Sequence, residues 1–306
     1  MDIRDIRKVL IIGAGTMGQQ IGFVCAMNGY DVVFYDISDE ILEKALKRVQ
    51  KLGSWFIAIG KLTPELLVET MARITTSSDE NEAARNVDFL SESVPEDPEL
   101  KAKVFARFNE LCPEHTIFTT NTSYLVPSMF AQASGRPEKL AALHFHDVRT
   151  SNVVDVMPHP GTAPEVTQTV HDFAESIGQI AIMLHKENNG YVFNTMLSSL
   201  TFSAMTLASK KVATIEDIDR AWMGVMHTPI GPFGIMDQVG LKTVWTITEY
   251  WAEKMNDPGA QANAAFVKEY VDKGWLGAKT RQGFYTYPDP AFSQDGFLSG
   301  KKEEKD

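Results

Sequence analysis

The sequence predicts a two-domain protein: an α/β amino-terminal domain with a mostly parallel sheet covered by helices on both faces, then an all-helical carboxyl-terminal domain. In the first two-thirds of the 306 residues, short β-branched apolar runs alternate with amphipathic stretches. Such repeated strand–helix–strand units build parallel strands joined by right-handed crossovers. The polar, turn-rich residues 186–190 end this pattern, and long helical segments follow. We therefore predict domains at residues 1–185 and 186–306.

The individual elements follow from the hydrophobic periodicity. Strands are expected at residues 8–12, 31–35, 87–90, 116–119, 140–145, 153–157 and 180–184, with helices between them that include 39–53 and 99–111. In the second domain, helices are expected at residues 191–211, 215–223, 241–255 and 260–273. The charged, apolar-poor tail from about residue 295 is expected to be disordered.

Composition limits the classes of partner and the compartment. The net charge of −11 repels phosphate backbones and anionic lipid, so we expect neither nucleic acid nor a membrane surface as a partner. The two cysteines, Cys25 and Cys112, lack the spacing of a metal site or a disulfide framework, and no metal is expected. The first ten residues do not resemble a targeting peptide, and no apolar run approaches the ~20 residues that span a membrane. These features predict a protein of the reducing cytoplasm.

A glycine-rich turn follows the first predicted strand and opens a predicted helix. Its first glycine allows a tight turn, the second lets the backbone approach a pyrophosphate, and the third lets the helix pack closely on the strand. The start of the helix adds free N–H groups and a positive dipole. A glycine turn without a ligand is the alternative. The residues predicted to bind a dinucleotide here are Gly13, Ala14, Gly15, Thr16, Met17 and Gly18.

Asp36 ends the second predicted strand, 18 residues after Gly18. A carboxylate at this point of a Rossmann-like domain binds the ribose hydroxyls of the adenosine and repels a 2′-phosphate. No arginine follows at residues 37–38 to receive such a phosphate. The sequence therefore predicts NAD, rather than NADP, as the cofactor.

The candidate acid–base group is a histidine. His144 lies near the end of the predicted strand 140–145, where open α/β sheets bind their ligands. Histidine titrates near neutral pH and can accept a hydroxyl proton as hydride leaves the same carbon. Asp155, on the next predicted strand, is available to orient the imidazole. His146 and His159 compete for this role on sequence alone, and a purely structural histidine is the alternative for each.

Six motifs stand in a fixed order along the chain. They are residues 13–18 with Asp36, then Asn121-Thr122-Ser123, then His144-Phe145, then residues 190–194 (Gly-Tyr-Val-Phe-Asn), 229–233 (Pro-Ile-Gly-Pro-Phe) and 277–285 (Gly-Ala-Lys-Thr-Arg-Gln-Gly-Phe-Tyr). Together they resemble the 3-hydroxyacyl-CoA dehydrogenase family, of which 3-hydroxybutyryl-CoA dehydrogenase is the short bacterial form. The resemblance runs from about residue 9 to 287. It implies a substrate cleft between the two domains and a homodimer built through the helical domain.

The resemblance also implies roles for individual residues. His144 would be the catalytic base and Asp155 its acid partner, while Ser123 and Asn194 would hydrogen-bond the reacting oxygen of the substrate. The residues that it implies at the cofactor are Glu96, Lys101, Asn121, Ser123, Asp147 and Lys279, the last from the second domain. Without the resemblance, a turn at Ser123, a water-facing Asn194, an exposed helix-start pair at Glu96 and Lys101, and a solvated Lys279 are the alternatives.

The segment after the histidine departs from the family pattern. The family typically reads His-Phe-Phe-Asn-Pro, with a glutamate twelve residues after the histidine. Here His146 and Asp147 fill the third and fourth positions, and Asp155 follows eleven residues after His144. A carboxylate at position 147 cannot donate to the nicotinamide carboxamide oxygen, but it favours the positively charged oxidised ring.

Residues 49–61 also depart from the family, which binds CoA near here through serine and lysine. The chain reads VQKLGSWFIAIGK, so Lys51 and Lys61 are the remaining candidates for substrate binding. We interpret the apolar residues 55–57 as core; an acyl-chain surface, a dimer surface or a lid are the alternatives.

Two branches of the family remain open for the substrate. Residues 155–160 resemble the Glu-x-x-Pro-His-Pro of the gulonate dehydrogenase and lambda-crystallin branch, whose members use free 3-hydroxy acids or serve as structural lens protein. Residues 277–285 favour the acyl-CoA branch. We predict NAD-dependent interconversion of (S)-3-hydroxyacyl-CoA, of the 3-hydroxybutyryl type, and 3-oxoacyl-CoA. The alternatives are oxidation of a free 3-hydroxy acid such as gulonate, or a non-catalytic NAD-binding protein.

Overall fold

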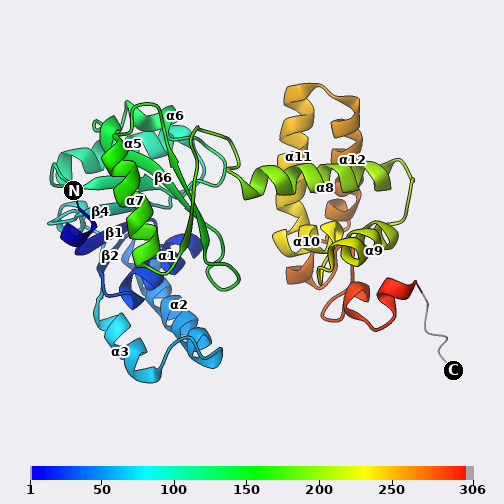
Figure 1. Cartoon of the computed structure of the whole chain (residues 1–306), viewed down its shortest axis with the longest axis horizontal. Helices are drawn as coiled ribbons and strands as arrows, with labels where there is room; N and C mark the ends of the chain where they lie inside the picture. Colours follow the sequence, from blue (N-terminus) through cyan, green and yellow to red (C-terminus); the bar gives the residue numbers. More distant parts are fainter. Residues whose placement is uncertain (1, 301–306) are drawn as a thin grey trace. The chain divides into compact units, whose positions relative to one another are not determined.

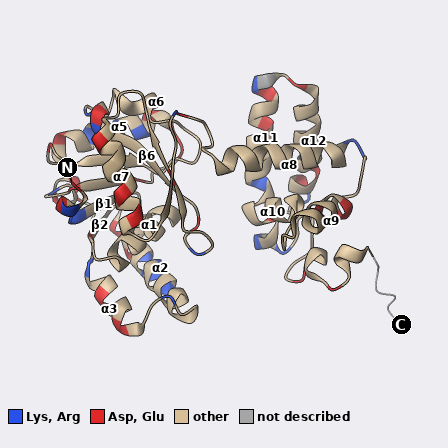
Figure 2. Ribbon diagram, viewed as in Figure 1, with Lys and Arg blue, Asp and Glu red and all other residues tan. Residues whose placement is uncertain are grey.

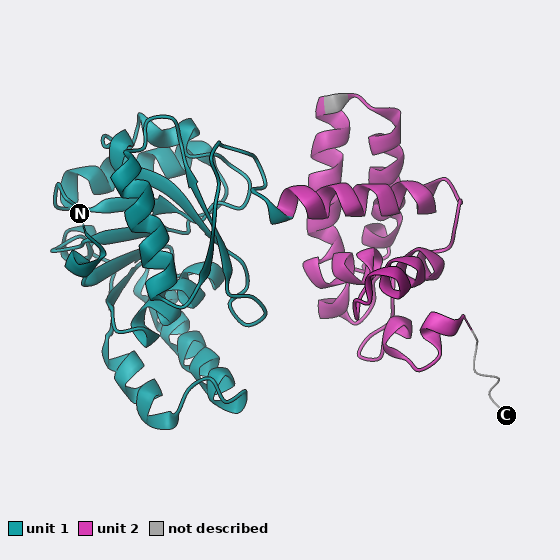
Figure 3. Ribbon diagram, in the orientation of Figure 1, with its two compact units in different colours: residues 1–193 teal, residues 194–306 magenta. Residues whose placement is uncertain are grey.

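The computed structural model describes residues 2–300, the side chain of residue 255 excepted. The chain divides into two compact units, residues 1–193 and 194–306 (Figure 3). The sequence places the boundary somewhat earlier, between residues 185 and 186. Each unit has its own apolar core.

The first unit is built on one eight-stranded sheet with the order β3-β2-β1-β4-β5-β6-β7-β8 (Figure 1). All neighbours are parallel except β6 and β7. Only residues 146–152 join that pair, which is too short for a crossover and gives an antiparallel connection. The strands are β1 (Lys8–Ile12), β2 (Asp31–Tyr35), β3 (Ile74–Ser77), β4 (Phe89–Glu92), β5 (Ile117–Thr120), β6 (Leu140–Phe145), β7 (Val153–Pro158) and β8 (Ile180–Met183).

The predicted α/β class with a mostly parallel, doubly wound sheet is confirmed. Val9 and Ile11 of β1 belong to one buried cluster, whereas Leu10 and Ile12 belong to a second, so apolar layers cover both faces of the sheet. The helices of this unit are α1 (Thr16–Met27), α2 (Asp39–Ala58), α3 (Pro64–Ala72), α4 (Glu80–Ala83), α5 (Pro98–Leu111), α6 (Ser128–Ala131) and α7 (Pro164–Ser176).

One strand was not expected from the sequence. β3 reads Ile-Thr-Thr-Ser and lies at the edge of the sheet, where only Ser77 is fully buried. A short, half-polar edge strand lacks the apolar run that marks the central strands of a parallel sheet.

The second unit is helical, as predicted. Its helices are α8 (Phe193–Ser209), α9 (Ile215–Met226), α10 (Pro232–Val239), α11 (Leu241–Met255) and α12 (Pro258–Asp272). The expected helix from residue 191 starts instead at Phe193, because Gly190 and Tyr191 adopt left-handed backbone. The short helix α10 was not expected. No helix in the described part of the chain is long and apolar enough to cross a membrane.

Two buried carboxylates tie the helical unit together. Asp219 accepts hydrogen bonds from the amides of Phe233 and Gly234 at the start of α10. Asp237 accepts from the amides of Phe284 and Tyr285. The motifs at residues 229–233 and 277–285 therefore shape this unit from within.

The structure differs from the expected disorder at the carboxyl-terminal end. A short 3-10 helix spans Phe297–Ser299, and its carbonyl at Phe297 accepts a hydrogen bond of 2.6 Å from Nε of Arg220. The guanidinium of Arg220 lies over the ring of the buried Phe297. These contacts order the segment, and the charged composition of the tail did not indicate them. Residues 301–306 lie outside the described part of the chain.

Candidate functional site

The glycine turn between β1 and α1 is fixed by close backbone packing. Gly13 has a φ of +92°, and a Cβ atom there would lie 2.7 Å from the carbonyl oxygen of Ser93. A Cβ on Gly18 would lie 2.0 Å from the carbonyl oxygen of Gly13. A Cβ on Gly15 would meet nothing within 4 Å. Gly13 and Gly18 therefore serve the fold, whereas Gly15 leaves open space at the start of α1.

The start of α1 offers polar groups toward that space. Gly15 is the N-cap, so no side chain caps the first turn of the helix. Asp36, directly after β2, accepts a hydrogen bond of 2.9 Å from the amide of Ala14 through Oδ2. Its other oxygen accepts from the amide of Ile37. A half-buried carboxylate thus lies beside the glycine turn, where the sequence predicts a ribose.

His144 and Asp155 face each other across the antiparallel pair β6–β7. Nδ1 of His144 lies 3.0 Å from Oδ2 of Asp155, and both side chains are almost fully buried. Burial raises the pKa of Asp155, but the hydrogen bonds and charges of His144 and His146 outweigh it and lower the pKa to about 2. An ionised carboxylate can only accept, so Nδ1 donates and Nε2 keeps its lone pair. Direct cross-strand pairing explains why a spacing of eleven residues still brings the two groups together.

The rings of Tyr191 and His146 pack against His144, and Phe193 packs against His146. The ring of Tyr191 stacks on His144 at a centroid distance of 4.6 Å and 10°. His146 lies edge-on to His144 at 4.8 Å and contacts Phe193 at 5.2 Å. Tyr191 was not singled out from the sequence, although its place in the Gly-Tyr-Val-Phe-Asn motif was a signal that could have found it.

His159 lies away from this cluster. β7 runs antiparallel to β6, so its last residue Pro158 pairs with Ala141 near the start of β6. Nε2 of His159 lies 2.8 Å from the carbonyl of Pro137, and its Nδ1 accepts from the amide of Gly161. His159 is therefore a structural histidine.

A hydrogen-bonded network occupies the ends of β4 and β5. Nζ of Lys101, which is 1% exposed, lies 2.7 Å from Oε1 of Glu92 and 3.5 Å from Oε2 of Glu96. Burial raises the pKa of Glu92, and the Lys101 ammonium opposes this by favouring the carboxylate. The buried Glu92 was not expected from the sequence, and it holds Lys101 away from solvent.

Glu96 organises the loop after β5. Its Oε1 accepts from the Thr122 hydroxyl and from the amides of Ser123 and Tyr124 at 3.1 Å. Asn121 accepts a hydrogen bond of 2.8 Å from the amide of Phe145, next to His144. The predicted residues Glu96, Asn121 and Ser123 are therefore brought together with the end of β6, and the Ser123 side chain is exposed.

Asp147 pairs with a neighbour that the sequence did not suggest. Its carboxylate accepts from Nε of Arg149 at 2.9 Å. This hydrogen bond from Arg149 lowers the pKa of Asp147. Gln20 of α1 accepts from the amide of Val148 and so links this loop to the helix of the glycine turn.

The predicted CoA-binding lysines lie on or after α2, a helix with several basic residues (Figure 2). Lys51 and Lys61 are both exposed. The interpretation of residues 55–57 as core holds for Phe56, which is buried against Phe23, whereas Trp55 and Ile57 are half-buried. A groove of 390 Å³ lies between α2 and α3, lined by Gln50, Ile57, Pro64, Leu67, Val68 and Met71.

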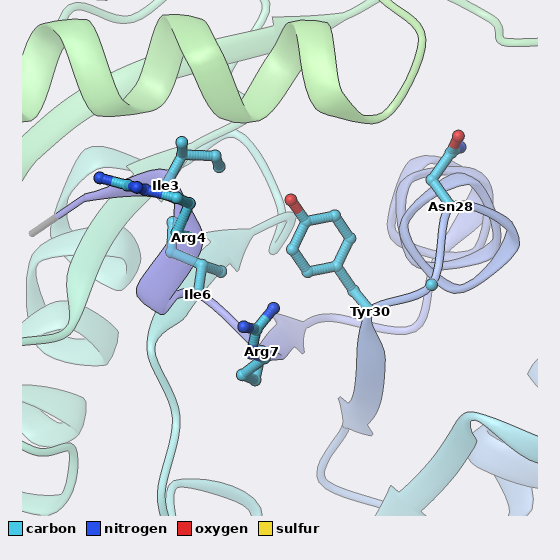
Figure 4. Close-up of a pocket in the computed structure, with 7 residues that line it drawn as sticks. Ile3, Arg4, Ile6, Arg7, Asn28 and Tyr30 are labelled. Atoms are coloured by element: carbon cyan, nitrogen blue, oxygen red, sulfur yellow. The ribbon is translucent and has the colours of Figure 1, made fainter.

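A second pocket, of 280 Å³, is lined by residues that precede β1 and β2 in the chain (Figure 4). Ile3, Arg7, Asn28 and Tyr30 are among its lining residues. It sits at the amino ends of β1 and β2, whereas the glycine turn follows the carboxyl end of β1. None of the predicted site residues lines it.

Asn194 and Lys279 belong to the second unit. Asn194 is half-buried near the start of α8, and Lys279 is exposed in a 3-10 turn at Ala278–Thr280. Their predicted roles stay predictions.

Comparison with known proteins identifies the family of the chain. The family model of the 3-hydroxyacyl-CoA dehydrogenase NAD-binding domain matches residues 8–188, and the family model of the C-terminal domain matches residues 190–287. The chain belongs to the 3-hydroxyacyl-CoA dehydrogenase family. It is 30% identical to a probable 3-hydroxybutyryl-CoA dehydrogenase of Bacillus subtilis over 93% of this chain and 99% of the relative.

Two solved structures agree with this assignment. The (S)-3-hydroxybutyryl-CoA dehydrogenase of Ralstonia eutropha has a TM-score of 0.84 and 29% identity, covering 93% of this chain and all of the other. A diketoreductase has a TM-score of 0.87 and 37% identity, covering 92% of this chain and 99% of the other. This member of the 3-hydroxyacyl-CoA dehydrogenase family is therefore an NAD-dependent oxidoreductase.

The residues of the glycine turn fit NAD. The open space at Gly15, the uncapped start of α1 and the Asp36 carboxylate are the groups that a dinucleotide needs for its pyrophosphate and ribose.

Two alanine substitutions in this dehydrogenase should separate the effect of a glycine on the stability of the fold from its effect on NADH binding. Gly13→Ala places a Cβ against backbone at a positive φ, so we expect a lower melting temperature even without NADH. Gly15→Ala meets no protein atom, so we expect an unchanged melting temperature and at least roughly tenfold weaker NADH binding, because only the pyrophosphate would meet the methyl group. Differential scanning fluorimetry and NADH fluorescence measure both. If Gly15→Ala binds NADH as tightly as the wild type, the pyrophosphate of the cofactor does not lie against this turn.

Proposed function

We propose that this enzyme interconverts (S)-3-hydroxyacyl-CoA and 3-oxoacyl-CoA, with a short substrate of the 3-hydroxybutyryl type. The observation that carries the proposal is the buried His144–Asp155 pair. His144 lies near the carboxyl end of β6, and the glycine turn follows the carboxyl end of the parallel strand β1. Full-length similarity to 3-hydroxybutyryl-CoA dehydrogenases supports the same substrate class.

In the proposed reaction, Asp155 holds His144 with its proton on Nδ1. Nε2 then accepts the proton of the 3-hydroxyl group, and the ionised Asp155 stabilises the imidazolium that forms. When bound, NAD supplies the hydride acceptor. In the reverse direction, the His144 imidazolium returns its proton to the alkoxide oxygen.

Ser123 is proposed to hydrogen-bond the reacting oxygen. Its exposed side chain lies on a loop that Glu96 fixes through backbone amides, so the hydroxyl is presented from a rigid support. The resemblance also implies Asn194 at this oxygen and Lys279 at the cofactor.

Asp36 is proposed to bind the ribose hydroxyls of NAD. Asp36→Asn keeps an acceptor for the Ala14 amide but removes the negative charge. We expect this variant to narrow the preference for NADH over NADPH by roughly tenfold, because the repulsion of the 2′-phosphate is lost. Fluorescence titration gives the dissociation constants of NADH and NADPH for both proteins. If their ratio is the same in Asp36→Asn as in the wild type, another residue determines the cofactor selectivity.

The substrate proposal is tested by NADH oxidation. We expect acetoacetyl-CoA to be reduced with a kcat/KM at least roughly a hundredfold above that of free acetoacetate, because the CoA moiety supplies binding energy. Free CoA should inhibit competitively. Equal rates with the free acid, and no inhibition by CoA, would contradict a CoA substrate.

A free dicarbonyl or hydroxy acid is the second candidate. The 37% identity to a diketoreductase, described as acting on dicarbonyl compounds, favours it. The Asp155-to-Pro160 segment points the same way, since it resembles the gulonate dehydrogenase branch. This candidate predicts reduction of a free dicarbonyl compound, or oxidation of gulonate, at a rate that CoA does not affect.

We further propose a homodimer through the helical unit. Met196 and Leu207 are exposed and eleven residues apart, which places both on one face of α8. A carboxylate on that face would oppose association, so Met196→Glu should give a monomer in size-exclusion chromatography with light scattering. Ser198→Glu, on another face of the same helix, should leave the dimer intact. A wild-type monomer would contradict the proposal.

A further inference from the structure

His146 departs from the family pattern, and the structure gives it an unusual environment. It stands where the typical His-Phe-Phe-Asn-Pro has a phenylalanine. Its Nε2 is buried yet makes no hydrogen bond within residues 2–300. The nearest charged group is Asp155, whose Oδ2 lies 3.7 Å away. A buried imidazole nitrogen without a hydrogen bond is costly unless another ligand satisfies it.

The same carboxylate oxygen also faces His144. One nitrogen of His144, one of His146 and one oxygen of Asp155 all lie within 4.8 Å of one another. The two distances to Asp155 Oδ2 are 3.0 Å and 3.7 Å. Ligands at 2.0–2.2 Å from a tetrahedral zinc ion are separated from each other by about 3.4 Å. The cluster needs little adjustment to close on one ion.

We propose that His144, His146 and Asp155 form a binding site for Zn²⁺ that inhibits the enzyme reversibly. Two imidazoles and one carboxylate are a ligand set that suits zinc, with the fourth position open to water. The surroundings hold the ligands in place, because Tyr191 stacks on His144 and Phe193 packs against His146. His146 is the ligand with access to solvent, since 18% of its side chain is exposed.

The inhibition follows from the tautomer of His144. Zinc takes the lone pair of Nδ1, so the proton on Nδ1 passes to solvent. The neutral, zinc-bound imidazole then carries its one proton on Nε2, which it takes from solvent. Nε2 no longer has a lone pair and cannot accept the hydroxyl proton of the substrate. In the direction of NADH oxidation, the neutral zinc-bound imidazole takes the place of the imidazolium and is a much weaker proton donor. This consequence rests on the proposed function, whereas binding of the ion does not.

The test combines metal binding with turnover. Binding of Co²⁺, read from its visible absorption, and of Zn²⁺, read by calorimetry, are measured without substrate. NADH oxidation is then followed in zinc buffered by nitrilotriacetate, with each variant compared with its own zinc-free rate. The variants are His146→Phe, which restores the family residue, and His171→Ala. The latter is a matched control, because the half-buried His171 forms a separate cluster with Asp172 and Glu175 on α7.

We expect one Zn²⁺ per wild-type chain, inhibition that EDTA reverses, and at least roughly tenfold weaker binding and inhibition in His146→Phe. His171→Ala should behave as wild type. Equal zinc affinity of wild type and His146→Phe, loss of binding in His171→Ala, or no Co²⁺ spectrum would overturn the proposal. If no substrate is turned over, the proposed function fails, and the Co²⁺ and Zn²⁺ titrations still decide the site.

Discussion

His144→Gln is expected to lower kcat by roughly 1,000-fold while leaving the dissociation constant of NADH nearly unchanged. Glutamine can still hydrogen-bond toward Asp155, but it cannot accept a proton near neutral pH. The loss therefore falls on proton transfer in both directions of the reaction. Stopped-flow or steady-state NADH oxidation, together with NADH fluorescence, measures the two quantities.

His159→Gln is the matched control for this experiment. His159 is also buried, but both of its ring nitrogens bind backbone groups at the other end of β7. This variant should lose some stability and keep its kcat. A His144→Gln enzyme with normal turnover would remove His144 from the mechanism, whatever the result at His159.

Lys101→Met is expected to destabilise the first unit by about 3–5 kcal/mol. The substitution leaves Glu92 buried without its cation, and the remaining donors, the Val94 amide and the Thr120 hydroxyl, do not neutralise the charge. The carboxyl group must then be buried with an uncompensated charge or become protonated. Calorimetry should record the unfolding of this unit roughly 10 °C lower.

A double variant separates this effect from a role at the cofactor. Glu92→Leu together with Lys101→Met removes both charges and should recover most of the lost stability, because an apolar pair of similar size replaces the ion pair. If Lys101→Met instead keeps its melting temperature and only loses NADH affinity, Lys101 acts on the cofactor, as the family resemblance implies.

Local pattern was sufficient for much of the fold. The strands β1, β2 and β6 agree with the predicted ranges, since a buried parallel strand is a continuous apolar run. The half-polar edge strand β3 and the short helix α10 were missed because neither carries a strong periodicity. The left-handed turn at Gly190 and Tyr191, which delays the start of α8, was also missed.

The candidate site was predictable only in part. His144 was singled out because it lies near the end of a predicted strand, and Asp155 because it lies on the next predicted strand. The family resemblance implied Glu96. Glu92 ends β4, two residues beyond the predicted strand, and Tyr191 lies in a turn, so the sequence indicated neither contact. The spacing of eleven residues between His144 and Asp155 differs from the twelve of the family, so the sequence alone did not establish their contact.

The sequence by itself determined the α/β class, the glycine turn with its acid, and the family, because these depend on local periodicity and on short spacings within one strand–turn–helix unit. Only the tertiary structure decided which groups meet across strands. The antiparallel register of β6 and β7 sets His144 opposite Asp155 and brings His146 to the same carboxylate. Register depends on how whole strands pair, and a sequence read along one strand does not contain its neighbour.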